Sequence, residues 1–343
     1  MVKIVCPNCA ADLDVPNAPI HTCEYCGTAI QVSQMVGPEG KNITGEKVTE
    51  EAKNTYVFKE HFIIRSQYNG SQAQNLMEDW IVKIPGAPQD FESTATITER
   101  KLKFYPIWVG EYKSSSQYAG LDNWPSFSKP AFDRPGWYEY VSYYKKEERG
   151  TVHREYQIPL LALHKTKIPK YLRDYNITTT GKEYFDIQHV KELGGDIIDS
   201  VFSLNEAKQT MYQGVIQRQN SEIYKEVTQI TSRNDNIEER GVYYIHFPVY
   251  EFKFTYGKKQ YEAFIDGSNG RIIHIDVPIS TRFRVITLSV GGAHAAAGTG
   301  LLISGLSVPS IAFFGIAAGI GILATGLVFI LLNFRRGARE KQT

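Results

Sequence analysis

The sequence predicts an α+β protein in three parts, and three observations lead to that prediction. The chain has four cysteines, and all of them lie in its N-terminal segment. Residues 285–333 contain no Asp, Glu, Lys or Arg. Between these two regions, helix-like and strand-like patterns of apolar residues follow one another along a long body.

The cysteines form two C-x2-C motifs, Cys6-Pro7-Asn8-Cys9 and Cys23-Glu24-Tyr25-Cys26. In a reducing compartment two such motifs favour a metal site over disulfides. Four thiolates suit tetrahedral zinc, and a site filled by four cysteines has no position for a catalytic water. We therefore expect residues 1–36 to be a ribbon holding one structural zinc ion through Cys6, Cys9, Cys23 and Cys26. Iron, and a redox-active cysteine pair, are the alternatives.

The residues around the motifs add detail to this prediction. Gly27 follows the second motif and permits a left-handed turn there, whereas Ala10 stands where a glycine often follows the first. A segment this short cannot build a sufficient apolar core, so the metal must supply much of its folding energy. His21 lies close to Cys23, and we expect it to be solvated.

The charge of the ribbon disfavours a role in nucleic-acid binding. Asp12, Asp14 and Glu24 stand against one basic residue, Lys3, and the whole chain carries a net charge of +1. Phosphate binding requires a basic surface. We therefore expect the ribbon to be structural or to bind protein.

The body is expected at residues 55–280, after a linker at 37–54 that is rich in Gly, Lys, Glu and Thr. It contains a weak internal repeat. An amphipathic helix at residues 71–81 precedes a strand at 95–112, and a helix from Ser203 precedes a strand at 242–256. The sequence thus predicts two related lobes of helix plus antiparallel sheet, about 55–165 and 200–280.

Three of the expected strands contain a central proline, at Pro106, Pro159 and Pro248. Proline cannot donate to a strand ladder, so each is expected at a sheet edge or a bulge. Residues 137–144 and 152–163 are predicted to form a hairpin around Lys145-Lys146-Glu147-Glu148-Arg149-Gly150. A second hairpin is predicted at residues 260–275, around Asp266-Gly267-Ser268-Asn269-Gly270.

The uncharged C-terminal stretch is divided by Pro309 into residues 285–306 and 310–333. Each part can supply the roughly 20 apolar residues that cross a membrane. Basic residues lie on both flanks, and residues 334–343 form a basic tail. The positive-inside rule then predicts a two-pass protein of the cell membrane with both termini in the cytoplasm, and no apolar signal segment opens the chain. Arg282, Arg284, Arg335 and Arg336 are the expected lipid contacts.

The predicted membrane helices contain a few residues of interest. Gly291, Gly315 and Gly319 are small enough for close helix packing, within the hairpin or between copies in a homo-oligomer. His294 is ionisable and lies inside the first helix, so it is a candidate polar site in the membrane. We expect a packing role for it rather than a proton or ion role.

The order of motifs resembles a family of zinc-ribbon membrane proteins of Gram-positive bacteria, often given a TFIIB-type ribbon label. The resemblance rests on the cysteine motifs, the Ala73…Trp80 helix, Pro88-Gln89-Asp90 and Tyr105-Pro106-Ile107-Trp108. The last of these is one residue tighter than the Y-x-P-x-W pattern of the family. The resemblance implies a ribbon, body and membrane anchor, and partners among flotillin-like or phage-shock-type membrane scaffolds.

No phosphate-binding loop, nucleophile elbow or metalloprotease motif occurs in the chain. The sequence therefore predicts a non-enzymatic adaptor that is anchored in the lipid bilayer, with its ribbon projecting on the linker to bind protein partners. Two alternatives remain. One is a nucleic-acid-binding membrane protein that uses Lys165, Lys167, Lys170 and Arg173, and the other is a small-molecule sensor with a cleft between the lobes.

Overall fold

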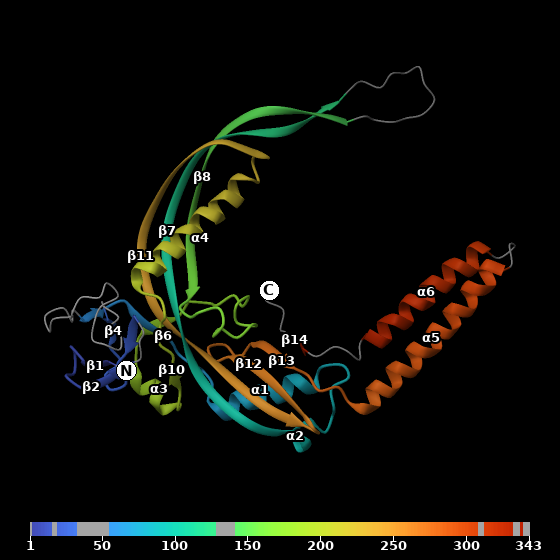
Figure 1. Ribbon diagram of the computed structural model, residues 1–343, viewed down its shortest axis with the longest axis horizontal. Helices are drawn as coiled ribbons and strands as arrows, with labels where there is room; N and C mark the ends of the chain where they lie inside the picture. The colour runs from blue at the N-terminus through green and yellow to red at the C-terminus, as the bar shows by residue number, and fades with distance from the viewer. Residues whose placement is uncertain are drawn as a thin grey trace.

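A computed structural model describes residues 2–15, 19–32, 55–127, 141–307, 312–331 and 337–338. The whole linker predicted at residues 37–54 and the turn at Pro309 lie outside the described residues, as do Arg335 and Arg336. The fold is mixed α+β (Figure 1). A long, curved sheet forms the body, the cysteine segment lies at one end of the molecule, and two apolar helices extend from the other.

The elements are as follows. The first strands are β1 (Val2–Val5), β2 (Asp12–Val15), β3 (Ile20–Thr22), β4 (Ala29–Val32), β5 (Thr55–Phe58) and β6 (His61–Ile64). The body continues with α1 (Gly70–Val82), α2 (Phe91–Thr94), β7 (Thr96–Phe127), β8 (Val141–Leu161), β9 (Lys182–Tyr184), α3 (Ile187–Glu192), β10 (Asp196–Ile197), α4 (Leu204–Ile223), β11 (Gln229–Tyr256), β12 (Lys259–Asp266) and β13 (Ile272–Asp276). The last elements are α5 (Thr281–Ser307), α6 (Ala312–Leu331) and β14 (Gly337–Ala338).

Two long antiparallel strands, β7 and β11, form the centre of the body sheet. Their register places Tyr105 opposite Phe247, so the two proline-centred segments lie side by side. On its other edge β7 pairs with β10 and then with β8, and β11 pairs with β6 and then with β12. The two expected lobes are therefore joined by the hydrogen bonds between β7 and β11, within one sheet.

The central prolines differ from the expectation that each marks an edge or a bulge. Pro106 lies in the middle of the sheet, between the residues of β7 that pair with β10 and those that pair with β8. Pro248 occupies the same kind of gap between β6 and β12 along β11. Because no neighbouring strand faces the missing N–H at either gap, neither proline costs a ladder hydrogen bond. Pro159 does lie on an edge strand, β8.

The hairpin predicted around residues 145–150 is wrong. These residues belong to the continuous strand β8, which pairs with β7 from Ile107↔Leu161 to Phe127↔Val141. Residues 145–150 resemble a turn in the sequence because they are polar and end in a glycine. The run instead faces solvent on an exposed strand, where polarity is permitted.

Helices α1 and α4 pack on the same face of the sheet, toward opposite ends of the long ladder. Both begin with a capping box, at Asn69 and at Ser203. The α1 side packs in a core with Phe104 and Phe252, whereas the α4 side packs with Trp108. These strand residues are all even-numbered, which places them on one face of the sheet. The opposite face is covered by the segment after β8, through Leu163, Ile168, Leu172 and Ile177.

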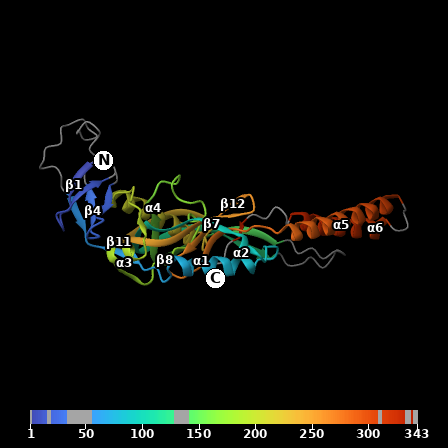
Figure 2. The ribbon, with the colours of Figure 1, turned by 90° about the horizontal axis from the view of Figure 1, so that it is seen from below.

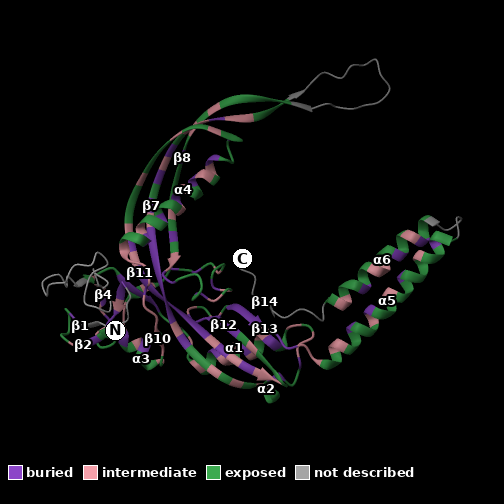
Figure 3. Cartoon of the chain, in the orientation of Figure 1, coloured by how far each residue is buried: buried purple, intermediate pink, exposed green. Residues whose placement is uncertain are grey.

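The two C-terminal helices match the predicted membrane spans closely. Helices α5 and α6 are long and apolar enough to cross a membrane, and Figure 3 shows that most of their surface is exposed. After α6 the chain returns to the body, where β14 pairs with β13. The hairpin is thus connected to the body at both of its ends.

Candidate metal centre

Two knuckles of the same design bring the four cysteines together: knuckle 1 is residues 6–10 and knuckle 2 is residues 23–27. In knuckle 1 the N–H of Ala10 donates to the carbonyl of Cys6 over 2.9 Å. In knuckle 2 the N–H of Gly27 donates to the carbonyl of Cys23 over 2.8 Å. Each turn then ends in a left-handed residue, Ala10 with φ 59° and Gly27 with φ 76°. Ala10 is the only non-glycine residue with positive φ in the described part of the chain.

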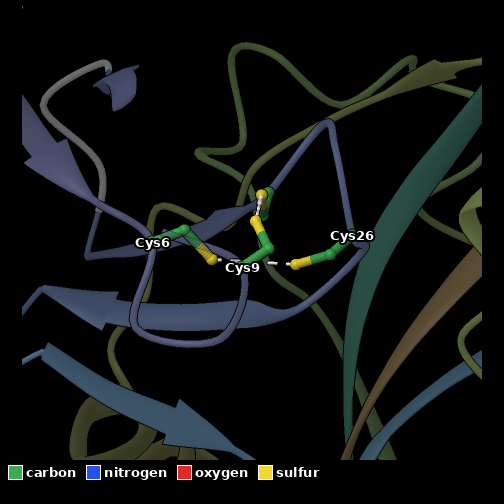
Figure 4. A group of neighbouring side chains, drawn as sticks. Cys6, Cys9 and Cys26 are labelled. Carbon is green, nitrogen blue, oxygen red and sulfur yellow. Dashed lines mark hydrogen bonds between the residues drawn. The ribbon is translucent and has the colours of Figure 1, made fainter. Parts of the chain in front are cut away.

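The sulfur positions fit a tetrahedral metal site. The four Sγ atoms all lie within 4.8 Å of one another, and the side chains point toward a common centre (Figure 4). Cys6 Sγ lies 3.7 Å from Cys26 Sγ, and Cys9 Sγ lies 3.8 Å from Cys23 Sγ. A tetrahedron with Zn–S bonds of about 2.3 Å has edges of about 3.8 Å. A disulfide needs about 2.05 Å, so the geometry matches a metal-binding set and not a bonded pair.

Polar neighbours of Cys26 favour its thiolate. Asn8 Nδ2 lies 3.6 Å from the sulfur, and Thr28 Oγ1 lies 3.2 Å from it. Burial raises the pKa of this thiol, but the hydrogen bonds with Thr28 and Asn8 outweigh burial and lower the pKa to about 6. For Cys23 burial dominates and raises the pKa to about 12. A bound cation favours the thiolate form at every one of the four sulfurs.

The segment that carries knuckle 2 is held on the body by polar contacts to one carboxylate. Asp199 accepts a hydrogen bond from the N–H of Thr22 over 3.0 Å, and its other oxygen lies 2.8 Å from His21 Nδ1. Thr22 Oγ1 in turn lies 3.3 Å from His246 Nε2 on β11. His21 was expected to be solvated, and this expectation is wrong because the body supplies its partner.

Apolar contacts complete the same docking. Ile20 and Ala29 are fully buried in one core with Trp108 of β7. Phe58 of β5 packs edge-on against Trp108, and β5 pairs with β4 of the ribbon. The expectation that the ribbon projects away from the body is therefore wrong. The apolar residues of β3 and β4 were the sequence signal for this docking, because a ribbon that projected into solvent would expose them to water.

Knuckle 2 itself touches the body at Gly27. A Cβ atom added there would lie 2.8 Å from Phe185 and 3.2 Å from Ile187. Knuckle 1 faces the other way, and Pro7, Asn8, Cys9 and Ala10 are all exposed. The two halves of the metal site therefore have different surroundings.

A buried polar cluster lies at the seam between ribbon and body. The rings of His61, Tyr244 and His246 lie 5.0 to 5.3 Å apart, centre to centre. Burial lowers the pKa of His246 to about 4 and holds the pKa of His61 well below its ordinary value. In the described part of the chain, His61 Nε2, His246 Nδ1 and Tyr244 Oη have no hydrogen-bond partner. The sequence shows these residues only as scattered positions, because the sheet register brings them together.

The glycines singled out in the membrane helices lie at the contact between α5 and α6. A Cβ atom at Gly291 would lie 3.0 Å from the carbonyl oxygen of Gly326, and one at Gly319 would lie 2.9 Å from that of Gly298. A Cβ atom at Gly315 would meet Gly305 at 2.7 Å. These three glycines thus allow α5 and α6 to pack closely against each other within one chain.

The remaining candidate residues lie apart from the metal centre. His294 Nδ1 lies 2.9 Å from the carbonyl oxygen of Val290, one turn earlier in α5. Arg282 is exposed and Arg284 is half-buried at the start of α5. The basic residues named for the nucleic-acid alternative lie on the loop after β8, where Arg173 donates to the carbonyls of Lys165 and Ile168.

No family model, curated protein or solved structure matches this chain.

Proposed function

We propose that this protein is a non-enzymatic adaptor, anchored in the membrane by α5 and α6, whose zinc ribbon binds protein partners. The observation that carries the proposal is the position of the ribbon. It lies at the end of the molecule opposite the helix pair (Figures 1 and 2), and residues 7–10 of knuckle 1 are exposed there. A membrane around α5 and α6 would leave this surface free for a partner.

The chemistry of the outer ribbon face suits protein recognition. Val5 is 56% exposed and Tyr25 is 55% exposed, and exposed aromatic residues are frequent binding anchors. Asp12, which lies opposite Val5 across β1 and β2, is exposed, and so are Asp14 and Glu24. An acidic face with apolar anchors favours a basic protein segment over the phosphates of a nucleic acid. Flotillin-like or phage-shock-type scaffolds, which the family resemblance implies, are the partners we propose.

Zinc is the metal that we propose for the four cysteines. The four-thiolate set and its tetrahedral spacing suit zinc as a structural ion. When bound, the ion supplies folding energy and charge neutralisation but no open coordination site. The chain's own residues do the rest: Asn8 and Thr28 support the thiolate of Cys26, and Asp199 holds the ribbon on the body.

The orientation in the membrane is also part of the proposal. Pairing of β14 with β13 supports an arrangement with both ends of the hairpin on the side of the body. The basic residues around the helices then favour the cytoplasmic side. The order of short strand, helix and long proline-centred strand occurs as β6-α1-β7 and again as β10-α4-β11. This order supports an origin of the body as two related halves.

Partner capture from cross-linked membranes tests the adaptor function. The native chain is compared with Tyr25→Ser, which keeps all four cysteines, and with Cys23→Ser/Cys26→Ser, which removes the metal. The exposed Tyr212→Ser on α4 is the matched control, because Tyr212 is 40% exposed and remote from the cysteines in sequence. We expect a defined protein set that is retained by Tyr212→Ser and reduced by both ribbon variants.

Two outcomes would reject the proposal. If both ribbon variants capture the same proteins as the native chain, the ribbon has only a structural role. If nuclease-sensitive nucleic acid is captured by the native chain and lost with Cys23→Ser/Cys26→Ser, the expectation drawn from the charge of the ribbon is wrong and a nucleic-acid-binding role replaces the adaptor role. Metal analysis of each variant separates loss of the surface from loss of zinc.

A further inference from the structure

Within the described residues, the long hairpin of β7 and β8 extends past the ends of α4 and β11, and one printed side-chain contact to β11 remains near its start, from Lys145 Nζ to Gln229 Oε1 over 3.4 Å. Strand β11 begins at Gln229, opposite Leu121, and helix α4 ends at Ile223. Beyond that point, in the part of the hairpin that the structure describes, residues 122–127 pair with residues 141–146, and we call these residues the arm end. A two-stranded ribbon alone is marginally stable in water. The arm end is therefore a segment that needs an external contact.

Aromatic residues are exposed on both faces of the arm end. Trp124 is 40% exposed and Tyr144, directly opposite it, is 52% exposed. Tyr143 is 67% exposed and lies on the other face, because successive residues of a strand alternate. A protein groove would cover one face of such a ribbon. The boundary layer of a lipid bilayer, which is partly apolar and partly hydrated, would surround the two strands and cover both faces.

The charged residues of the arm end fit the same kind of layer. Lys145 and Lys146 are exposed, and Asp122 is the only acidic residue of the segment. Lys146 Nζ lies 3.8 Å from the centre of the Trp124 ring, with Trp124 Nε1 donating to Glu148 over 2.9 Å. Tryptophan, tyrosine and lysine together are typical of the boundary between lipid headgroups and hydrocarbon.

The shape of the sheet brings the arm end to the membrane side. The sheet of β7, β8 and β11 is an arc, and the helix pair leaves from near one end of it (Figure 1). The free end of the arc bends round toward the side on which α5 and α6 extend, and Figure 2 agrees. The base of α5 is fixed to the body, because the N–H of Ser280 donates to the carbonyl of Gly86 over 2.9 Å.

We propose that the arm end binds the lipid headgroup layer of the membrane that holds α5 and α6, through Trp124, Tyr143, Tyr144 and the two lysines. The body would then touch the membrane at two separated points, the helix pair and the arm end. This inference rests on the membrane anchor of the proposed function, but not on the partners of the ribbon. Two contacts would fix the tilt of the body and the direction in which knuckle 1 points.

A photo-crosslinking residue placed in the full chain tests this contact. Benzoylphenylalanine replaces Tyr143 in one variant and Tyr184 in the control, because Tyr184 on β9 is 73% exposed and pairs with Phe62 of β6, a strand that lies far along the arc from the arm end (Figure 1). Each variant is reconstituted in vesicles of phosphatidylcholine with phosphatidylglycerol, illuminated and digested. Mass spectrometry then measures lipid adducts. We expect at least five-fold more lipid adduct from position 143 than from position 184, in keeping with the selective placement of aromatic residues at interfaces.

Flotation of the vesicles separates failure of the anchor from failure of the arm end. If the chain does not float with the vesicles, the anchor fails and this proposal fails with it. If the chain floats but positions 143 and 184 give equal lipid adducts, the arm-end contact alone is rejected. Cross-links from position 143 to a second copy of the chain would also reject it, in favour of an arm-to-arm contact. The triple variant Trp124→Ser/Tyr143→Ser/Tyr144→Ser should still float, since the helix pair is intact.

Discussion

The two cysteine knuckles share a motif, a turn and a set of backbone hydrogen bonds, yet knuckle 1 is exposed along its turn whereas knuckle 2 packs its Gly27 against the body. Ala10 and Gly27 end the two turns with similar backbone angles. Around Ala10 the chain is exposed, whereas Gly27 is packed against Phe185 and Ile187. The two turns thus have the same backbone geometry, and they differ in what lies next to the residue that ends each turn.

This difference separates two roles of one metal centre. On the side of knuckle 2, an ion bound by the four cysteines would fix β3 and β4 so that Ile20 and Ala29 can cover Trp108. At knuckle 1 and at the exposed Tyr25, the same ion would hold a small surface in one shape. Loss of the metal should therefore damage both roles, whereas Gly27→Ala should damage only the docking and Tyr25→Ser only the exposed surface.

The largest effect is expected from removing two metal ligands with Cys23→Ser/Cys26→Ser. Structural zinc contributes about 10–16 kcal/mol to the folding of small domains, so the ribbon should unfold and leave the body. We expect loss of the bound metal together with a rise of at least 100-fold in amide exchange over residues 19–32, measured by mass spectrometry. Retained protection in the metal-free variant would show that contacts with the body, and not the metal, hold the ribbon.

The next largest effect is expected from Gly27→Ala. The left-handed backbone disfavours alanine by roughly 1–2 kcal/mol, and the added Cβ would meet Phe185 at 2.8 Å. We expect a loss of about 2–3 kcal/mol in ribbon docking, measured as amide exchange of residues 19–32. Gly257→Ala is the matched control, because Gly257 has φ 62° and open space around it. The control is measured by amide exchange of its own hairpin, β11 and β12. Equal losses of stability at the two sites would mean that contact with the body adds nothing.

Acid should weaken the seam near knuckle 2 through His246. Its pKa is about 4 in the folded protein, because burial disfavours the charged ring, and about 6.5 when unfolded. The unfolded state therefore binds a proton first, so this stability is fully present above about pH 6.5 and falls as the pH decreases toward 4. We expect a loss of about 2 kcal/mol between pH 7 and pH 5.

The pH effect is measured by urea unfolding of the native chain and of His246→Gln. The variant should lose less stability over the same pH range, because it lacks this ring. His61, Tyr244, Thr22 and Asp199 surround His246, and protonation of the cysteines also weakens metal binding, so the difference between the two proteins is the quantity of interest. Parallel curves for the two proteins would exclude His246 as the titrating group.

Local patterns allowed some of these features to be predicted from sequence. The cysteine spacing gave the four clustered sulfurs, and the uncharged stretch gave the two apolar helices. The docking of the ribbon was missed because its contacts join residues far apart in the chain, such as Thr22 and His246. The continuous β8 was missed because a charged run inside an exposed strand resembles a turn, and Lys145–Gly150 meet their partners only through the register with β7.

The smallest effect is expected from Ala10→Gly, which makes knuckle 1 match knuckle 2. Glycine would relieve the left-handed strain of alanine, worth roughly 1 kcal/mol. It would also add flexibility to the unfolded chain, which costs roughly 0.5–1 kcal/mol. The two terms oppose each other, and no buried contact is disturbed because Ala10 is exposed. Zinc affinity, measured by competition with a chromophoric chelator, should stay within about five-fold of the native value. A change in zinc affinity as large as the one that Gly27→Ala gives in the same competition assay would show that the backbone turn, and not the neighbouring body, sets the difference between the knuckles.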